Sequence, residues 1–204
     1  MSKNRVTGVI LAGGRARRMG GEDKGLVQIN NQAMISYVID ALHPQVAAIV
    51  LNINRNESTY RRFGYPIVAD DLAGFQGPLA GMAAAMARVS TEYIFTCPCD
   101  GPLLAGDIVA RLFAAMTAEG GDICVPHDGD RLQSVCALID CRLRESLLEY
   151  LTGKDRKIEH WYRQHKLVLA DFSDEQRCFL NANSPRDLEA ISTHLKGSRQ
   201  HEGH

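Results

Sequence analysis

The sequence predicts an α/β fold in which a mainly parallel β-sheet is covered by helices on both faces. Short apolar, β-branched runs alternate along the chain with longer segments whose apolar residues recur at helical spacing. Strands that alternate with helices pair in parallel through right-handed crossovers. After residue 120 two apolar runs flank His127-Asp128-Gly129-Asp130. Because Asp-Gly is a hairpin turn signal, we expect an antiparallel excursion there.

The first half of the chain shows the alternation in order. Residues 6–11 predict a buried strand, and an amphipathic helix follows at i, i+3, i+4, i+7 spacing, with Ile35, Val38, Ile39 and Leu42 on its inner face. Three more strands are predicted at residues 48–52, 67–69 and 93–97. Two more helices are predicted to begin at Gly77-Pro78 and at Gly106-Asp107, because proline and aspartate suit a helix N-terminus.

The second half begins with the antiparallel strands, expected at residues 123–126 and 135–139. A helix with Leu143, Leu147, Leu148 and Leu151 on its inner face, a strand at 167–169 and a last helix capped at Ser184-Pro185 complete the pattern. The sequence contains no internal repeat and no linker of distinct composition, so we expect a single domain over residues 1–196. Residues 197–204 lack apolar side chains and are expected to form a disordered tail.

Composition excludes several classes of function. The 204 residues are 45% hydrophobic and 23% charged, which suits one folded core, and the net charge of -1 provides no field for nucleic acid. The sequence shows neither an apolar run of the roughly 20 residues that a membrane span needs nor a signal peptide, so we expect a cytoplasmic protein without membrane contact. The six cysteines are expected to be buried, reduced thiols, because the only close pair, Cys97-Pro98-Cys99, lacks zinc-ligand spacing.

A glycine- and arginine-rich loop follows the first predicted strand. Residues 11–25 contain five glycines, three arginines and Lys24. Glycines let backbone N–H groups converge on a phosphate, and cationic side chains neutralise its charge. The spacing is neither that of a P-loop nor that of Gly-x-Gly-x-x-Gly. We therefore expect a triphosphate cradle of another type.

Polar side chains stand at the ends of three further predicted strands. They are Asn52, Asp70-Asp71 and Asp100. Ligands bind outside the carboxyl ends of parallel strands, so these side chains and the loop predict one site. Asparagine and aspartate can recognise a base or a ribose, and a carboxylate beyond a strand can hold a Mg²⁺ that bridges phosphates. We assign the metal to Asp100.

Several segments together resemble a known family. They are Leu11-Ala12-Gly13-Gly14, Arg18-Met19-Gly20, Asp23-Lys24, Gln76-Gly77-Pro78-Leu79-Ala80-Gly81, Cys97-Pro98-Cys99-Asp100, Leu148-Glu149-Tyr150-Leu151 and Asn181-Ala182-Asn183-Ser184-Pro185. From about residue 5 to about residue 195 the chain closely resembles the molybdenum cofactor guanylyltransferase family. The first segment is shared with many sugar and pterin nucleotidyltransferases, whereas the later ones are more selective.

The resemblance implies a three-layer, Rossmann-like nucleotidyltransferase fold and a defined reaction. GMP would pass from Mg-GTP to the terminal phosphate of molybdopterin, which gives molybdopterin guanine dinucleotide and pyrophosphate. Transient contact with molybdoenzymes or their chaperones would follow. The implied GTP contacts are Leu11, Ala12, Gly13, Gly14, Lys24, Asn52, Asp70 and Asp100. The implied molybdopterin contacts are Arg156, Asn181 and Asn183, and the implied catalytic residues are Arg18, Lys24 and Asp100.

The residue chemistry agrees with this implication. Both reacting groups are phosphates, so the main barrier is charge repulsion, which Mg²⁺ on Asp100 and the cations Arg15, Arg18 and Lys24 would offset. The sequence departs from the family near Ser134, where a proline is expected, and this leaves the pterin contacts of that segment open. His127, His160 and His165 lack ligand spacing and are expected to be solvated or packed. Trp161 and Tyr162 are expected to be packing residues.

Two alternatives remain open at this point. One is a cytidylyl- or sugar-phosphate nucleotidyltransferase of the same fold, because a few hydrogen bonds that the sequence does not fix choose the base. The other is a non-catalytic carrier of GTP or pterin, which would share the cradle without needing Asp100.

Overall fold

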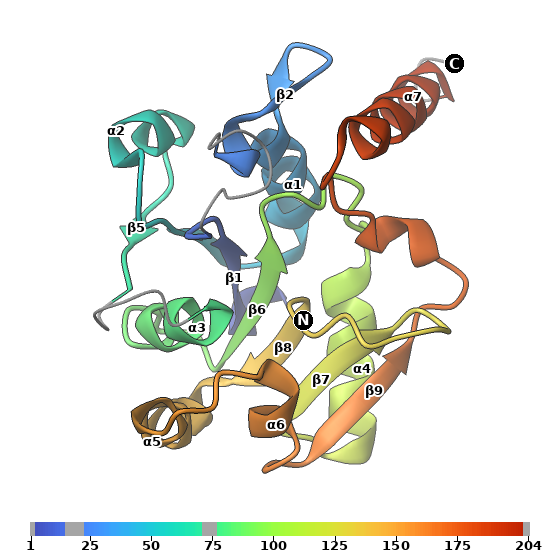
Figure 1. Cartoon of the computed structure of the whole chain (residues 1–204). Helices are drawn as coiled ribbons and strands as arrows, with labels where there is room; N and C mark the ends of the chain where they lie inside the picture. The colour runs from blue at the N-terminus through green and yellow to red at the C-terminus, as the bar shows by residue number, and fades with distance from the viewer. Residues whose placement is uncertain (1–2, 15–22, 71–76, 202–204) are drawn as a thin grey trace.

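The structure, a computed structural model, describes residues 3–14, 23–70 and 77–201. Among these residues a seven-stranded sheet runs through the molecule in the order β5-β4-β1-β6-β8-β7-β9 (Figure 1). Its strands are β1 (Val6–Leu11), β4 (Ala48–Asn52), β5 (Ile67–Val68), β6 (Tyr93–Pro98), β7 (Ile123–His127), β8 (Ala137–Asp140) and β9 (Leu167–Asp171). A separate two-stranded ribbon consists of β2 (Gln28–Ile29) and β3 (Gln32–Ala33).

The sheet is mainly parallel, as predicted. Strands β5, β4, β1 and β6 pair in parallel, and β9 pairs in parallel with β7. Strand β8 is antiparallel to both of its neighbours, β6 and β7. The predicted antiparallel excursion is therefore confirmed. The segment between β7 and β8 folds back at Gly129, whose φ of 95° is a conformation that glycine adopts without a steric penalty.

Helices cover both faces of the sheet and make the predicted three layers. The helices are α1 (Met34–Leu42), α2 (Glu57–Tyr60), α3 (Pro78–Met86), α4 (Ile108–Glu119), α5 (Arg144–Thr152), α6 (Ile158–Tyr162) and α7 (Pro185–His201). Short 3₁₀ segments are η1 (Lys3–Arg5), η2 (Lys24–Leu26), η3 (His43–Gln45), η4 (Arg61–Phe63), η5 (Cys141–Leu143) and η6 (Gln176–Phe179). Helices α1 and α4 share one apolar core with the sheet, whereas α3, α5 and α6 share the core on the other face.

The buried aromatic and sulfur side chains behave as predicted. Trp161 and Tyr162 are fully buried in the core under α5 and α6, so they are packing residues. All six cysteines are free thiols, and five are buried, with Cys141 partly exposed. Burial raises the pKa of Cys124 and of Cys178 to about 12, which keeps both thiols protonated and unreactive. Within the described ranges, no helix combines the length and the apolar character that crossing a membrane requires.

The structure differs from the prediction in three places. The ribbon β2-β3 and the short helices α2 and α6 were not predicted, because two to five residues are too few to show a period. Helix α3 is buried along its whole length after Pro78, not on one face only. Helix α7 continues through Gly197 to His201 and so extends into the segment expected to be disordered. One glycine costs a helix only about 1 kcal/mol, which does not end it.

Candidate functional site

The carboxyl ends of β4, β5 and β6 bring three predicted site residues to one cavity. Asn52 is the last residue of β4, Asp70 follows β5, and Asp100 follows β6. All three line a cavity of about 340 Å³, together with Gly13 and Gly14 from the segment after β1. We call it the Asn52 cavity. The structure therefore brings Asn52, Asp70 and Asp100 together at one cavity.

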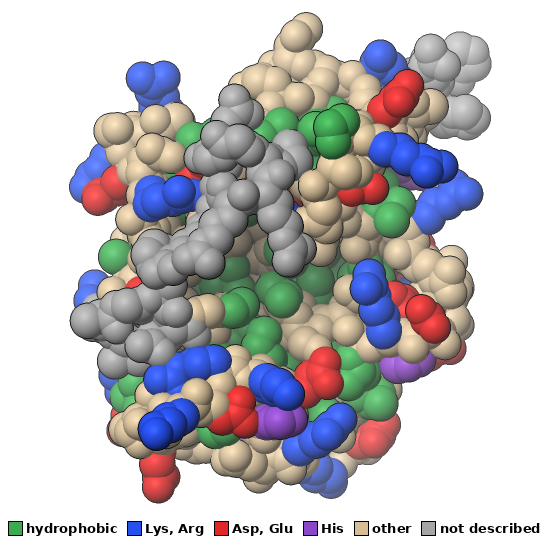
Figure 2. Space-filling model, in the orientation of Figure 1, with side chains coloured by type: hydrophobic (Ala, Val, Ile, Leu, Met, Phe, Trp, Pro, Cys, Tyr) green, Lys and Arg blue, Asp and Glu red, His purple; other side chains and the backbone are tan. Residues whose placement is uncertain are grey.

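Two smaller cavities extend the Asn52 cavity into a continuous groove. The Lys24 cavity, about 200 Å³, shares Leu11, Gly14 and Asp100 with it. The Ser134 cavity, about 270 Å³, shares Pro98, Val135 and Asn181 with it. Figure 2 shows a hollow with hydrophobic side chains on its floor in the middle of this face. We call the three cavities together the strand-end groove.

Lys24 joins the two sides of the groove. Its Nζ lies 2.7 Å from Asp100 Oδ2 and donates a second hydrogen bond, of 2.5 Å, to Asn183 Oδ1. The segment that carries Asn183 is fixed to the same place, because the Ala182 N–H donates to the Asp100 carbonyl oxygen at 2.9 Å. The lysine and aspartate side chains are 25% and 13% exposed, so both charges remain accessible from the groove.

Asn52 and Asp70 belong to a hydrogen-bonded set that includes Asn54. Asn52 Nδ2 donates to Asp70 Oδ1 at 2.8 Å, and Asn54 Nδ2 donates to Asp70 Oδ2 at 2.7 Å. The Asp70 N–H in turn donates to Asn54 Oδ1 at 3.0 Å. Sequence reasoning missed Asn54, although it also lines the Asn52 cavity. The signal was present, since Asn54 stands two residues beyond the strand end.

Two glycines make room for these asparagines. A Cβ on Gly13 would lie 2.4 Å from Asn54 Nδ2, and a Cβ on Gly81 would lie 2.3 Å from Asn52 Oδ1. Both distances are far below van der Waals contact, so only glycine fits beside the present asparagine positions. Gly13 of the Leu-Ala-Gly-Gly loop and Gly81 of helix α3 therefore shape the Asn52 cavity directly.

The residues expected on the molybdopterin side are only partly brought together. Asn181 lines both the Asn52 and the Ser134 cavities, and Asn183 contacts Lys24. Arg156 instead donates from Nη1 to the carbonyl oxygens of Gly153 and Asp155 in its own loop. It is not among the described residues that line the three cavities.

The lining of the Ser134 cavity includes the segment around Ser134, where the sequence departs from the family. It is lined by Arg131, Leu132, Gln133 and Ser134 from the segment between β7 and β8, opposite Phe179 and Asn181. This arrangement places a cation and several hydrogen-bonding groups beside an apolar wall. A flat ligand with polar edges fits such a lining.

Other predicted residues lie outside the groove or outside the described residues. Arg15, Arg18 and Asp71 lie outside the described residues. His160 contacts the carboxylate of Asp155, and His165 packs against the ring of Trp161. His165 is therefore packed and His160 is exposed, as predicted, although the ion pair of His160 was not predicted.

The donor set fits a magnesium ion held by one carboxylate. In the described ranges no group of three or more His, Cys, Asp or Glu side chains is arranged to hold a metal ion by itself. Mg²⁺ usually binds through one or two carboxylates and completes its shell with waters and substrate phosphates. Asp100, which faces the groove beside Lys24, supplies such a carboxylate.

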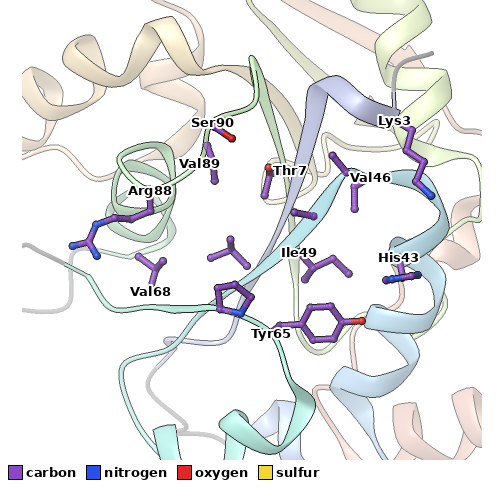
Figure 3. Close-up of a pocket in the computed structure, with 14 residues that line it drawn as sticks. Lys3, Thr7, His43, Val46, Ile49, Tyr65, Val68, Arg88, Val89 and Ser90 are labelled. Atoms are coloured by element: carbon purple, nitrogen blue, oxygen red, sulfur yellow. The ribbon is translucent and has the colours of Figure 1, made fainter.

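A separate cavity of about 480 Å³ lies at the opposite end of the sheet (Figure 3). It is lined by residues near the amino ends of β1 and β4, among them Thr7 and Ile49, and its walls are mostly apolar. Its described lining contains no carboxylate. It therefore lacks the metal-binding chemistry of the strand-end groove.

Comparisons with known proteins agree with this geometry. A family model described as the MobA-like NTP transferase domain matches residues 8–168. A molybdenum cofactor guanylyltransferase from Shewanella loihica is 47% identical over 187 residues, which are 92% of this chain and 95% of that protein. A protein of the same name from Shewanella sp. (strain MR-4) is 44% identical over 193 residues, which are 95% of this chain and 98% of that protein.

Solved structures with low sequence identity share the fold. Molybdopterin-guanine dinucleotide biosynthesis protein A from Archaeoglobus fulgidus superposes with a TM-score of 0.79 at 20% identity, covering 94% of this chain and 99% of that chain. A 4-diphosphocytidyl-2C-methyl-D-erythritol synthase from Anaerococcus prevotii superposes with a TM-score of 0.71 at 10% identity, covering 96% and 100%. Together with the family model and the relatives that match along nearly the whole chain, these likenesses show that the chain belongs to the MobA-like NTP transferase family.

Proposed function

We propose that this chain transfers GMP from Mg-GTP to the terminal phosphate of molybdopterin and so forms molybdopterin guanine dinucleotide and pyrophosphate. The observation that carries the proposal is the contact of Lys24 with both Asp100 and Asn183 inside the groove. One ammonium group thereby links the cavity suited to a nucleotide with the segment expected on the pterin side. The names of relatives at 44–47% identity support the same reaction.

The nucleotide would occupy the Asn52 and Lys24 cavities. Asn52, Asn54 and Asp70 offer a fixed pattern of donors and acceptors to a nucleoside, and the backbone from Leu11 to Gly14 lies beside the space for the phosphates. Lys24 would neutralise charge that grows on the pyrophosphate leaving group. We propose that Arg18, from the same loop, assists it.

The second substrate needs no general base. A phosphate monoester has a second pKa of about 6 and is largely ionised at neutral pH, so it can attack directly. The protein must instead hold two anions in line and offset their repulsion. Asn181 and the Ser134 cavity would orient molybdopterin beside the nucleotide. Arg156 would contact molybdopterin after its loop turns toward the groove.

We propose that Asp100 holds a magnesium ion. When bound, the ion supplies charge neutralisation between phosphate oxygens. Asp100 now accepts a hydrogen bond from Lys24 at 2.7 Å, so this lysine would turn toward the triphosphate when the carboxylate takes up the metal. Contact with molybdoenzymes or their chaperones, and a cytoplasmic location where GTP is available, complete the proposal.

Release of pyrophosphate tests the reaction. Purified protein with Mg²⁺ should release pyrophosphate from GTP only when molybdopterin is present, and CTP, ATP and UTP should compete poorly. Replacing Asp100 by alanine should lower turnover by about a hundredfold or more while much GTP affinity remains. Tightest binding of CTP would favour the cytidylyl alternative. A wild-type protein that releases no pyrophosphate, and whose GTP affinity is unchanged by Asp100→Ala, would favour a carrier.

A further inference from the structure

We infer that Tyr60 is a positioning residue for nucleotide binding, because its hydroxyl binds Asp23 on one side of Lys24 and leaves room only for glycine at position 25 on the other side. The inference rests on the proposed function and deepens it. It gives a role to the short helix α2, which ends at Tyr60 and is not part of the loop that carries Lys24. The resulting contact crosses 37 positions of sequence.

Asp23, which precedes Lys24, accepts hydrogen bonds at both of its carboxylate oxygens. Tyr60 Oη donates to Asp23 Oδ1 at 2.5 Å, and Asn56 Nδ2 donates to Asp23 Oδ2 at 3.2 Å. Asp23 is only 8% exposed and Tyr60 is fully buried. A carboxylate this far from water is stable only when donors satisfy it, so these two contacts fix where Asp23 can lie.

Gly25, which follows Lys24, packs directly on the same hydroxyl. A Cβ added to Gly25 would lie 2.6 Å from Tyr60 Oη and 3.3 Å from Cys99 Sγ. Cys99 precedes Asp100, and its N–H donates to the Leu11 carbonyl oxygen at 3.2 Å. The hydroxyl of Tyr60 therefore sits where the lysine loop and the end of β6 meet.

This arrangement limits where the Lys24 ammonium can go. The turn is closed by the Leu26 N–H, which donates to the Asp23 carbonyl oxygen at 2.9 Å, so the Cα of Lys24 is held between two anchored neighbours. A lysine side chain loses much rotamer freedom when it binds an anion, and a fixed backbone reduces what remains to be lost. Burial raises the pKa of the Tyr60 hydroxyl well above its usual range, so it remains a donor throughout the working pH range.

A double-mutant cycle on GTP affinity tests the inference. Mg-GTP is titrated calorimetrically into wild type, Tyr60→Phe, Lys24→Ala and the double variant. We expect Tyr60→Phe to weaken binding by about tenfold, the usual effect of losing one hydrogen bond to a charged group. In the Lys24→Ala background the same change should have no further effect, because the side chain that it positions is gone.

The control is Tyr37→Phe, which removes another buried tyrosine hydroxyl. Tyr37 Oη donates to the Ile29 carbonyl oxygen at 2.9 Å and lies in a separate apolar cluster. This variant should bind Mg-GTP like wild type. Should Tyr60→Phe fail to fold, Asn56→Gly removes the second donor to Asp23 at an exposed position whose φ of 53° glycine tolerates, and it should weaken binding in the same direction.

Two outcomes would overturn the inference. One is unchanged Mg-GTP affinity in a folded Tyr60→Phe variant, and the other is an equal loss with and without Lys24, which would mean a general structural effect. The proposed function fails separately, if wild type binds Mg-GTP but releases no pyrophosphate with molybdopterin. Even then, the double-mutant cycle on Mg-GTP affinity tests the role of Tyr60.

Discussion

Replacing Gly81 by alanine should damage the nucleotide cavity although it adds a better helix former. The new Cβ would lie 2.3 Å from Asn52 Oδ1, 2.7 Å from Asn52 Cγ and 2.9 Å from Leu11 Cδ2. Asn52 is 3% exposed and donates to both Asp70 Oδ1 and the Val68 carbonyl oxygen, so it cannot move without weakening these hydrogen bonds. Its amide must shift by about 1 Å, and a misplacement of that size can cost about a hundredfold in rate.

The effect on stability follows from two opposing contributions. Weakening the two hydrogen bonds of Asn52 costs about 1–3 kcal/mol, whereas alanine contributes about 1 kcal/mol to the helix. We therefore expect a loss of about 1 kcal/mol and a fall in Tm of about 2–4 °C. The matched control is Gly197→Ala in α7, where an added Cβ meets nothing within 4 Å and stability should be equal or higher.

Thermal unfolding measures the change in Tm, and steady-state kinetics with GTP as the varied substrate measure the change in kcat/KM. A Gly81→Ala protein with wild-type kcat/KM for GTP and an unchanged or raised Tm would refute the reasoning from the close contact.

Three further predictions concern other parts of the chain. Asn54→Ala should weaken Mg-GTP binding by about tenfold in a titration, since Asp70 loses both of its hydrogen bonds with Asn54; unchanged affinity would contradict this. The Lys157 N–H and His160 lower the pKa of Asp155 to about 2, below its value of about 3.9 in an unfolded chain. Its contribution to stability is therefore complete above about pH 4 and is lost as pH falls towards 2, so the deficit of Asp155→Asn in urea unfolding should shrink between pH 5 and pH 2.5. Native protein should expose at most the partly buried Cys141 to a thiol reagent, whereas unfolded protein should react at all six cysteines; fast reaction of several native thiols would contradict the burial.

The parts of the fold that the sequence predicts are those with a clear period or a continuous apolar run. Residues 6–11 and 48–52 become β1 and β4 with the expected bounds, because each is a short, mostly apolar run that the fold buries. The rule that ligands bind beyond the carboxyl ends of parallel strands then places Asn52, Asp70 and Asp100 together before any coordinates are known.

The parts that the sequence does not predict depend on tertiary contacts. The bond between Tyr60 and Asp23 joins segments that no local pattern relates, and α2 is too short to show a period. Arg156 carries a charge that suits phosphate binding, but its Nη1 donates hydrogen bonds to two carbonyl oxygens of its own loop. A charged residue in a loop is thus a candidate for phosphate binding, whereas the local hydrogen bonds decide where its side chain points.

The bond between Lys24 and Asn183 has a consequence for how the enzyme matures. The two residues are 159 positions apart, so the last partner of this lysine leaves the ribosome long after the cradle has been synthesised. A nascent chain, or one that a protease has cut before Asn183, would possess the glycine loop and Asp100 while lacking the amide oxygen that accepts the hydrogen bond from Lys24. The contacts of Lys24 in the strand-end groove are therefore complete only once the ribosome has synthesised the chain as far as residue 183.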